Sequence, residues 1–589
     1  MTQAIQRINS AQGDELSALA DGLLDSVILS TGFAPKSKQQ VRAAQTSQLT
    51  VASDRLIREC VRALRFGGLL FVYGPPAELI YWGRFLHALP DAAQEMVFKY
   101  WIALDIDETP RGPLLQATHQ GLLLFSKAES NRKRPTAFHL ETDLIRVPHR
   151  YCAACGQNLK DWGGKKHLMN PRGAAPSDVW RDLPRRAIRD NAIPEDVLER
   201  IRLLAGGDSA KALHVIQTGQ GVETNLILTS DVAMAAADST TDAFQELAGL
   251  ETDCVYQGDC VAFLERVKTL HPEGAFDLAF ADPPYNLEKK YDTYTDTLAE
   301  QHYLEWCNAW LEGMAQTLKP GGSLLVLNLP KWALHHATFL SGRLEFRHWI
   351  VWDALSDPRG KLMPAHYALL YFTKPGGKPV FNYSPVGTPP RASLVSPPDS
   401  PKYCLRARCI KERKLVGDDE KVELSDIWVD IHRIKHKRDR DSHPCQLPEK
   451  LMERIILLTT RRGGVVFDPF CGAGTTAIAA AKLGRKFVVT DLDPKYVRIT
   501  KEKLAAMRQN ADRLGSYVVP RTSVARSRGT SSKRGIELYL QQLACKLGRV
   551  PTEADVNVDR PEILGQIDRT YPNRGAAFKR ARIVLPKPA

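Results

Sequence analysis

The stretch FADPPYN at residues 280–286 places a carboxylate, two prolines and an aromatic ring directly after an apolar run. The preceding residues GAFDLAFA predict a short buried strand, and Asp282 follows it. Proline has no N–H for a sheet and fixes φ, so Pro283 and Pro284 end the strand and stiffen the loop. Open α/β sheets bind ligands in loops of this kind, at the carboxyl ends of strands. We therefore expect a functional loop that contains Asp282, Pro283, Pro284 and Tyr285, with a surface turn as the alternative.

A glycine turn between two predicted strands gives a second candidate site, in VVFDPFCGAGTTAIAAAKLGRKFVVTD at residues 465–491. The first strand ends at Asp468, Gly472 and Gly474 open a helix, and the next strand ends at Asp491. Glycines let the backbone approach a ligand closely, and an acid after the second strand suits a ribose diol. A phosphate site is the rival interpretation, but the turn has no third glycine and no lysine for a phosphate. The pattern therefore favours a nucleoside cofactor without phosphates.

Strands and helices alternate around both motifs. Residues 254–267 predict a strand, a Gly258-Asp259 turn and a helix, and residues 301–330 predict a helix, a Pro-Gly-Gly turn and a strand. This βαβ alternation is typical of an α/β fold with a parallel sheet.

Together these motifs resemble those of the S-adenosylmethionine-dependent amino-methyltransferases of DNA. DPPY at 282–285 is similar to the catalytic motif of that family, and DPFCGAGTT at 468–476 to its F-x-G-x-G cofactor motif. The segment 442–460 is similar to the helix that covers the cofactor. The order, with the catalytic motif first, is that of the β subgroup, whose members are usually adenine-N6 enzymes. The resemblance spans about residues 250–510 and departs from the family at Leu447, where a lysine is usual.

The resemblance implies a Rossmann-like methyltransferase sheet, S-adenosylmethionine as cofactor and double-stranded DNA as substrate, often within restriction-modification. The carboxylate of Asp282 and the carbonyl of Pro283 would hold the target amine, and Tyr285 would stack on a base flipped out of the duplex. Aspartate rather than serine before the prolines favours adenine-N6 over cytosine-N4 methylation. A non-catalytic DNA-binding scaffold is the alternative from a different class. No restriction partner can be read from the sequence.

The same resemblance implies a set of cofactor-binding residues. They are Asp259, Asp468, Phe470, Gly472, Gly474, Thr475 and Asp491. The two glycines would approach the methionine part, Phe470 would line the pocket, and Asp491 would bind the ribose. Asp259 would bind the adenine end, and Asp468 would orient the loop or the amino group of the cofactor.

An internal repeat links the first part of the chain to the catalytic region. LRFGGLLFVYGPP at 64–76 parallels LKPGGSLLVLNLP at 318–330, and extension of the match places Ser30 where Asp282 stands. We therefore predict that residues 1–210 form a degenerate methyltransferase-like domain, which packs on the catalytic copy as an intrachain pseudodimer. Shared α/β scaffolding without duplication is the alternative.

Charge and composition complete the predicted domain organisation. The net charge is +13, and residues 501–589 carry 18 Lys/Arg against 8 Asp/Glu, which indicates a polyanionic partner for that end. The last residues also resemble, through LGRVPTEADV and YPNRGAAFKRA, the small helical repeat attached to homing endonucleases. The remaining predicted segments are a connection at 211–249, a catalytic domain at 250–515 with target recognition at about 376–442, a basic linker at 516–535 and a helical DNA-binding module at 536–589.

Composition also argues against a secreted protein and against a membrane-spanning one. With 43% hydrophobic and 25% charged residues and no apolar run of membrane length, we expect a globular cytoplasmic protein. The eleven cysteines are an odd number and suggest reduced thiols. Cys152-x2-Cys155 and Cys404-x4-Cys409 could bind zinc, but the second spacing is loose, so the sequence alone assigns no metal ligand.

Overall fold

The computed structural model divides into two compact units, residues 1–515 and 516–589, and each is described by itself. The structure describes residues 6–9, 17–30, 51–87, 94–108, 115–129, 136–159, 167, 169–188, 192–207, 212–216, 249–286, 298–354, 361–382, 395–396, 404, 406–415, 422–434, 446–513, 536, 539–540, 543–544, 550–559, 561–571 and 573–580. The predicted linker at 516–535, most of the connection at 211–249 and much of the recognition segment at 376–442 lie outside these residues.

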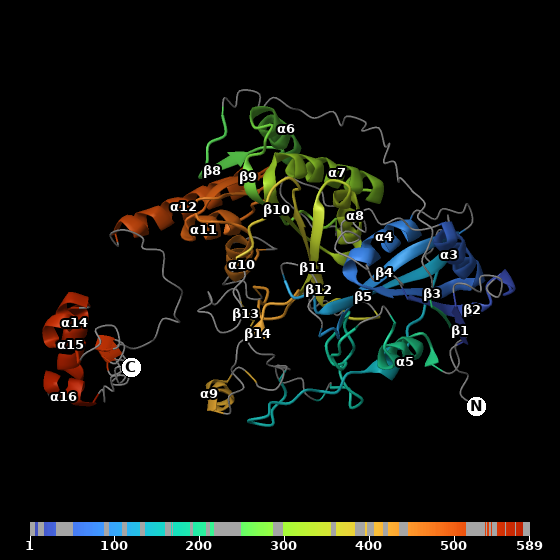
Figure 1. Ribbon diagram of the computed structural model, residues 1–589, viewed down its shortest axis with the longest axis horizontal. Helices are drawn as coiled ribbons and strands as arrows, with labels where there is room; N and C mark the ends of the chain where they lie inside the picture. The colour runs from blue at the N-terminus through green and yellow to red at the C-terminus, as the bar shows by residue number, and fades with distance from the viewer. Residues whose placement is uncertain are drawn as a thin grey trace. The chain divides into compact units, whose positions relative to one another are not determined.

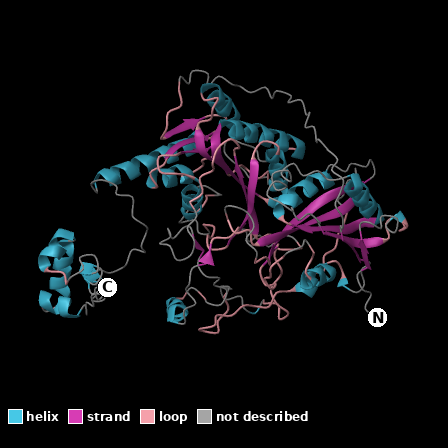
Figure 2. Cartoon of the chain, viewed as in Figure 1, coloured by secondary structure: helices cyan, strands magenta, loops and turns pink. Residues whose placement is uncertain are grey.

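The catalytic region is built on an eight-stranded sheet (Figures 1 and 2). Its strands, in spatial order, are β15 (Ile427–Trp428), β11 (Glu345–Asp353), β12 (His366–Thr373), β10 (Leu318–Asn328), β9 (Phe276–Ala281), β16 (Val465–Asp468), β17 (Lys486–Asp491) and β8 (Cys254–Gln257). Strands β10, β9, β16, β17 and β8 pair in parallel, whereas β12 pairs antiparallel with β10 and β11. The predicted α/β class is therefore confirmed.

Helices cover both faces of this sheet. The helices of this region are α6 (Cys260–Leu270), α7 (Glu300–Thr317), α8 (Pro330–Ser341), α9 (Ala407–Leu415), α10 (Glu449–Thr459), α11 (Thr475–Lys482) and α12 (Pro494–Arg513). Ala279 and Ala281 of β9 share a core with α6, α7 and α8, whereas Leu278 and Phe280 share one with α10, α11 and α12. This alternation follows from the two-residue period of a strand, and it explains why β9 is apolar on both sides. A two-stranded ribbon, β13 (Val395–Ser396) with β14 (Val422–Glu423), lies apart from the main sheet.

The first part of the chain forms a seven-stranded sheet. Its strands, in spatial order, are β1 (Gln6–Asn9), β7 (Ala212–Ile216), β2 (Leu24–Ser30), β3 (Leu64–Gly74), β5 (His119–Glu129), β4 (Gln94–Asp105) and β6 (Val179–Trp180). Its helices are α3 (Val51–Ala63), α4 (Pro76–His87), α5 (Glu195–Leu204) and a 3₁₀ turn η3 (Thr142–Ile145). Strand β7 lies in the segment where the sequence predicts only a connection, so this sheet continues past residue 210.

The two sheets have matching topologies. The order β7-β2-β3-β5-β4-β6 corresponds to β16-β9-β10-β12-β11-β15, with the same relative strand directions. Leu24 in β2 is paired as Phe276 is in β9, which places Ser30 at the position of Asp282. In the described part of the first sheet, the place beside β7 that corresponds to β17 is taken by β1. Strand β1 comes from the start of the chain, whereas β17 follows β16 in sequence.

Matching ion pairs strengthen this correspondence. Arg200 donates two hydrogen bonds to Asp182 at 2.9 and 2.6 Å, and Arg454 donates two to Asp430 at 2.8 and 2.6 Å. Each guanidinium also lies over the ring of a tryptophan in β6 or β15. Arg454 is fully buried, and its charge holds the pKa of Asp430 below the usual range although burial alone would raise it.

The two sheets meet through reciprocal contacts. Trp101 of β4 stacks on Trp349 of β11 with ring centroids 3.7 Å apart. Nearby, Asp426 accepts the backbone N–H of Thr118 at 2.9 Å, and its carboxylate lies 2.9 Å from Nδ1 of His119. The carboxylate of Asp178 accepts the backbone N–H of Ala365 at 2.8 Å and lies 3.2 Å from Nδ1 of His366. Reciprocity of this kind is typical of an isologous interface between two similar subunits.

The second unit is a small helical module. It contains α14 (Glu553–Asp559), α15 (Pro561–Thr570) and α16 (Arg574–Arg580), with an apolar core that includes Ile536 and Leu540. Arg574 links the helices through hydrogen bonds to Asp568 at 2.7 Å and Glu553 at 2.9 Å. The short helices expected here are present. None of the helices in the described ranges of either unit is long and apolar enough to cross a bilayer.

We predict that Asp426→Ala lowers the free energy of unfolding by about 2–5 kcal/mol, because it leaves buried donors on the opposite sheet without an acceptor. Glu300→Ala removes the partner of Lys331 in a half-exposed pair, and it should cost about 0–1 kcal/mol. Denaturant unfolding measured for both variants checks this. Equal losses would contradict a role for Asp426 in joining the sheets.

Candidate functional site

Both predicted motifs line one cavity of about 310 Å³ at the carboxyl ends of β9, β16 and β17. Ten of the eleven residues that the sequence assigns to the site contribute to its wall. They are Asp259, Asp282, Pro283, Pro284, Tyr285, Asp468, Phe470, Gly472, Thr475 and Asp491. Gly474 is the exception.

Hydrogen bonds from two neighbouring helices fix the loop that follows β9. Tyr303 of α7 donates its hydroxyl to the carbonyl of Pro284 at 2.7 Å, and Trp332 of α8 donates its indole N–H to the carbonyl of Tyr285 at 2.9 Å. Tyr285 in turn donates its hydroxyl to the carboxylate of Asp282 at 2.5 Å. The rigidity that the prolines predict is therefore reinforced from outside the motif.

Tyr285 is less open than the sequence suggests. Its exposed fraction is 8%, and its ring packs against Tyr367 with centroids 5.8 Å apart. In this structure the contact of Tyr285 that bears directly on chemistry is the hydrogen bond that orients Asp282.

The carboxylates of the second motif shape the glycine turn. Asp491 accepts the N–H of Gly472 at 2.8 Å, and Asp468 accepts the N–H of Phe470 at 2.9 Å and the hydroxyl of Thr476 at 2.5 Å. Gly472 has φ of +48°, a left-handed conformation that a residue with a side chain rarely adopts. The acids and the glycine therefore hold each other in place through the chain's own hydrogen bonds.

Burial of these acids changes their acidity. Burial raises the pKa of Asp468 to about 7, an effect that the hydrogen bonds from Thr476 and Phe470 oppose and that nearby Asp282 and Asp491 increase. Burial also raises the pKa of Asp491 to about 6. Several carboxylates confined in one cavity repel each other, so a ligand that carries positive charge would be stabilised there.

Two predicted cofactor residues have structural tasks in this state. Asp259 is the N-cap of α6 and accepts the N–H groups of Val261 and Ala262, each at 3.0 Å. Gly474 begins α11 with φ of +83°, and a Cβ at this position would lie 2.6 Å from the side chain of Thr500. Gly474 is therefore required for the turn and for contact with α12, whereas it does not line the cavity.

The structure adds wall residues that the sequence analysis did not assign to the site, some of them within the same motifs. They are Gly258, Cys260, Trp306, Gln446, Leu447, Pro469, Cys471, Ala473, Thr476, Leu492, Asp493 and Tyr496. Phe470 packs against Trp306 with ring centroids 5.6 Å apart, and the two rings form an aromatic side of the cavity. Leu492 is 50% exposed although it is apolar, which suits contact with a flat ligand ring. Its position directly after Asp491 is the one sequence signal that could have identified it.

The chain is similar in sequence to known DNA methylases. A family model described as DNA methylase matches residues 276–502. The chain is 31% identical over 250 residues to the type II methyltransferase M.HpaI of Haemophilus parainfluenzae, a match that covers 42% of this chain and 73% of that relative. The chain belongs to this DNA methylase family.

Two further matches each cover 42% of this chain. The chain is 37% identical over 260 residues to the type II methyltransferase M.BamHI of Bacillus amyloliquefaciens, and the match covers 42% of this chain and 56% of that relative. The chain therefore spans little more than half the length of M.BamHI. The crystal structure of the M1.HpyAVI-SAM complex is 20% identical, with a TM-score of 0.30, over 42% of this chain and 98% of that one.

We predict that Gly474→Ala destabilises the methylase more than Gly463→Ala. Both glycines have a similar positive φ, +83° and +80°, so both substitutions carry strain of about 1–2 kcal/mol. Only the first adds a clash with Thr500, worth about 1–3 kcal/mol more, because nothing lies within 4 Å of a Cβ at Gly463. Thermal and denaturant unfolding of the two variants measures the difference, and equal destabilisation would show that the contact with α12 is unimportant.

Proposed function

We propose that this chain transfers a methyl group from S-adenosylmethionine to the N6 amine of adenine in double-stranded DNA, at a specific short sequence. The observation that carries the proposal is that the loop of Asp282 and the turn of Gly472 line the same cavity. A donor held at the turn and an amine held at the loop would face each other across it. The membership of the chain in the DNA methylase family supports this reaction class.

The cavity has the chemistry that S-adenosylmethionine requires. The cofactor supplies an activated methyl group on a sulfonium, and its sulfonium and ammonium groups are positively charged. Asp468 is buried and Asp491 is partly buried, both have raised pKa values, and a cation would relieve their repulsion. Phe470 and Leu492 offer apolar surface for the adenine ring, and Asp491 and Asp259 would reach the ribose and the adenine end.

Asp282 and Pro283 would prepare the target nitrogen. The lone pair of an exocyclic amine is delocalised into the base, so the amine is a weak nucleophile. Acceptance of its two hydrogens by the carboxylate of Asp282 and the carbonyl of Pro283 would favour a tetrahedral nitrogen whose lone pair points into the cavity. The negative charge of Asp282 would also stabilise the positive charge that develops on nitrogen. The hydrogen bond from Tyr285 holds this carboxylate in one orientation.

The target base must leave the duplex to reach Asp282, because its amine is paired inside the helix. Stacking of the extruded base on Tyr285 belongs to the proposal. Since that ring is mostly buried against Tyr367, the loop would have to move to uncover its face.

Methylation of cytosine N4 is the alternative within the enzyme class, because the same cradle would hold that amine. Asp282 favours adenine, since the resemblance associates aspartate before Pro-Pro-Tyr with adenine enzymes. A non-catalytic DNA-binding scaffold is less well supported, because the catalytic loop and the complete glycine turn line one cavity.

Residues 1–210 would form a degenerate copy that supports the catalytic one. The matching strand order and the reciprocal contacts of Asp178 and Asp426 support duplication and an intrachain pseudodimer. Ser30 occupies the position of Asp282, so the first copy would lack the catalytic acceptor. The basic helical module at 536–589 would add affinity for DNA phosphates.

We predict that Asp282→Asn lowers methyl transfer by at least about a hundredfold while the cofactor still binds. Asp277→Asn, at the other end of β9, is the matched control and should keep near wild-type activity, because Asp277 accepts hydrogen bonds from Lys319 and Val465 and does not line the cavity. Transfer of tritiated methyl groups to DNA, with separation of the nucleosides, measures both the rate and the base. Label on cytosine would contradict the adenine assignment. A wild-type protein that transfers no label would contradict the proposal that the chain is a methyltransferase.

We also predict that S-adenosylmethionine binds about tenfold more weakly at pH 6 than at pH 8. The pKa of Asp468 is raised to about 7, so this carboxyl is ionised at pH 8 and mostly neutral at pH 6, where it no longer attracts a cation. Calorimetry in two buffers of different ionisation enthalpy should detect protons that are released on cofactor binding between pH 6 and pH 8. Asp468→Asn should remove most of the slope. An affinity independent of pH would contradict direct contact between this acid and the cofactor.

A further inference from the structure

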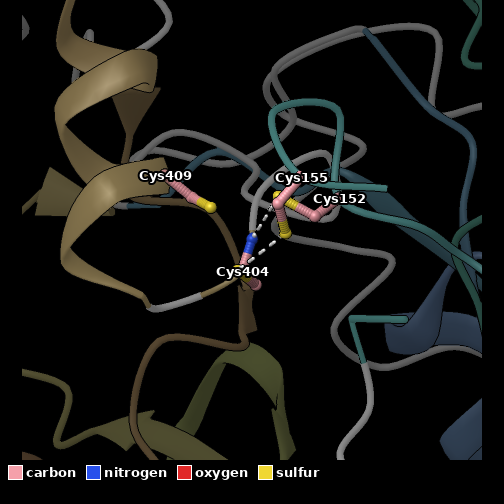
Figure 3. Close-up of side chains that lie close together, drawn as sticks. All are labelled: Cys152, Cys155, Cys404 and Cys409. Carbon is pink, nitrogen blue, oxygen red and sulfur yellow. Dashed lines mark hydrogen bonds between the residues drawn. The ribbon is translucent and has the colours of Figure 1, made fainter. Parts of the chain in front are cut away.

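Four cysteines from distant parts of the chain converge at one point of the first unit (Figure 3). Cys152 and Cys155 belong to the first copy, whereas Cys404 and Cys409 belong to the segment between the catalytic and cofactor motifs of the second. Their four sulfur atoms all lie within 4.8 Å of one another. The cluster is remote in sequence from the methyl-transfer site, and none of its members lines that cavity.

The spacing of the sulfur atoms suits a tetrahedral metal ion. A Zn–S bond of about 2.3 Å requires sulfur atoms about 3.8 Å apart in a tetrahedron. The Sγ atoms of Cys155 and Cys404 are 3.8 Å apart. A disulfide would need about 2.05 Å, so this pair is arranged for a shared ligand rather than for a covalent bond.

The backbone around Cys152 and Cys155 forms a tight chelating turn. The N–H of Gly156 donates to the carbonyl of Cys152 at 2.8 Å, and the N–H of Cys152 donates to the carbonyl of Gln157 at 2.7 Å. Gly156 has φ of +63°, and a Cβ added there would meet no atom within 4 Å, so backbone conformation alone explains the glycine. The turn thus presents two sulfur atoms on the same side.

Hydrogen-bond donors approach the sulfur atoms of Cys152 and Cys155. The backbone N–H of Cys404 donates to Sγ of Cys152 at 3.3 Å, and Nη1 of Arg406 lies 3.7 Å from Sγ of Cys155. Four thiolates around a divalent cation carry two net negative charges, which backbone donors and a guanidinium stabilise. Cys409 completes the set from the first turn of α9 and is fully buried.

We propose that Cys152, Cys155, Cys404 and Cys409 bind one structural Zn²⁺ ion that fastens the segment around α9 to the first copy. Four thiolates select zinc over the oxygen-seeking Mg²⁺ and Ca²⁺, and a closed four-ligand site leaves no position for substrate. Binding would release the thiol protons and would link two segments about 250 residues apart. The site is independent of the proposed methyl transfer, since it shares no residue with the cavity.

Elemental analysis of the purified full-length chain tests the proposal, with one zinc per chain expected. Cys155→Ser and Cys404→Ser should each lower the retained zinc at least about tenfold after dialysis against a chelator. Cys254→Ser is the matched control, because Cys254 is also half-buried but lies outside the cluster, and it should keep the full zinc content. Retention of S-adenosylmethionine binding by the variants would show that they fold.

Replacement of zinc by Co²⁺ in the wild-type chain provides a second readout that does not depend on variants. The proposal predicts thiolate-to-cobalt charge-transfer absorption and the strong d–d bands of a tetrahedral site, both abolished by added Zn²⁺. A metal-free protein, stoichiometric iron in place of zinc, unchanged zinc in both variants, or disulfides among these four residues in mass mapping would each overturn it.

Discussion

The site depends on one constraint, the meeting of three parallel strands whose carboxyl ends each lead to an aspartate. Strands β9, β16 and β17 are neighbours in the sheet, so Asp282, Asp468 and Asp491 open into one cavity. Their burial is unfavourable, and the raised pKa values of Asp468 and Asp491 reflect it. The sheet enforces this arrangement because a slip of one residue would exchange the small side chains that β9 packs into one core with the large ones that it packs into the other.

The same acids compensate for part of that cost by organising the loops around them. Asp491 accepts the N–H of Gly472, and Asp468 accepts the N–H of Phe470, so groups of the chain itself hold the turn that would bind a cofactor. Tyr285 similarly orients Asp282. Preorganisation of this kind reduces the ordering that binding would otherwise require, which is why an unfavourable cluster of charges is compatible with a stable fold.

Local sequence patterns predicted the elements of the site, whereas long-range packing determined their detailed roles. Strand endings, prolines and glycines identify Asp282 and Gly472, because these residues act through their own backbone. The reason for Gly474 is the side chain of Thr500, and the loop of Tyr285 is fastened by Trp332, 47 residues later. Neither partner follows from any short motif. The four cysteines illustrate the same limit, because the sequence offers them as possible zinc ligands but only the folded chain brings their sulfur atoms together.

The degenerate copy that we propose for the first part of the chain would still be necessary for the other copy through packing. One apolar core runs through helices of both copies, and it includes Trp101 stacked on Trp349 and Leu79 with Leu334. Gly83 of α4 leaves room for Leu334 of α8, since a Cβ there would lie 2.4 Å from that side chain. Without the first copy, this apolar face of the catalytic sheet and its helices would be exposed to water, at a cost of about 25 cal/mol for each Å². Retention of these contacts requires complementary shape from residues 1–210 and no chemistry from Ser30, so the degenerate copy that we propose could keep its fold without an acceptor at the position of Asp282.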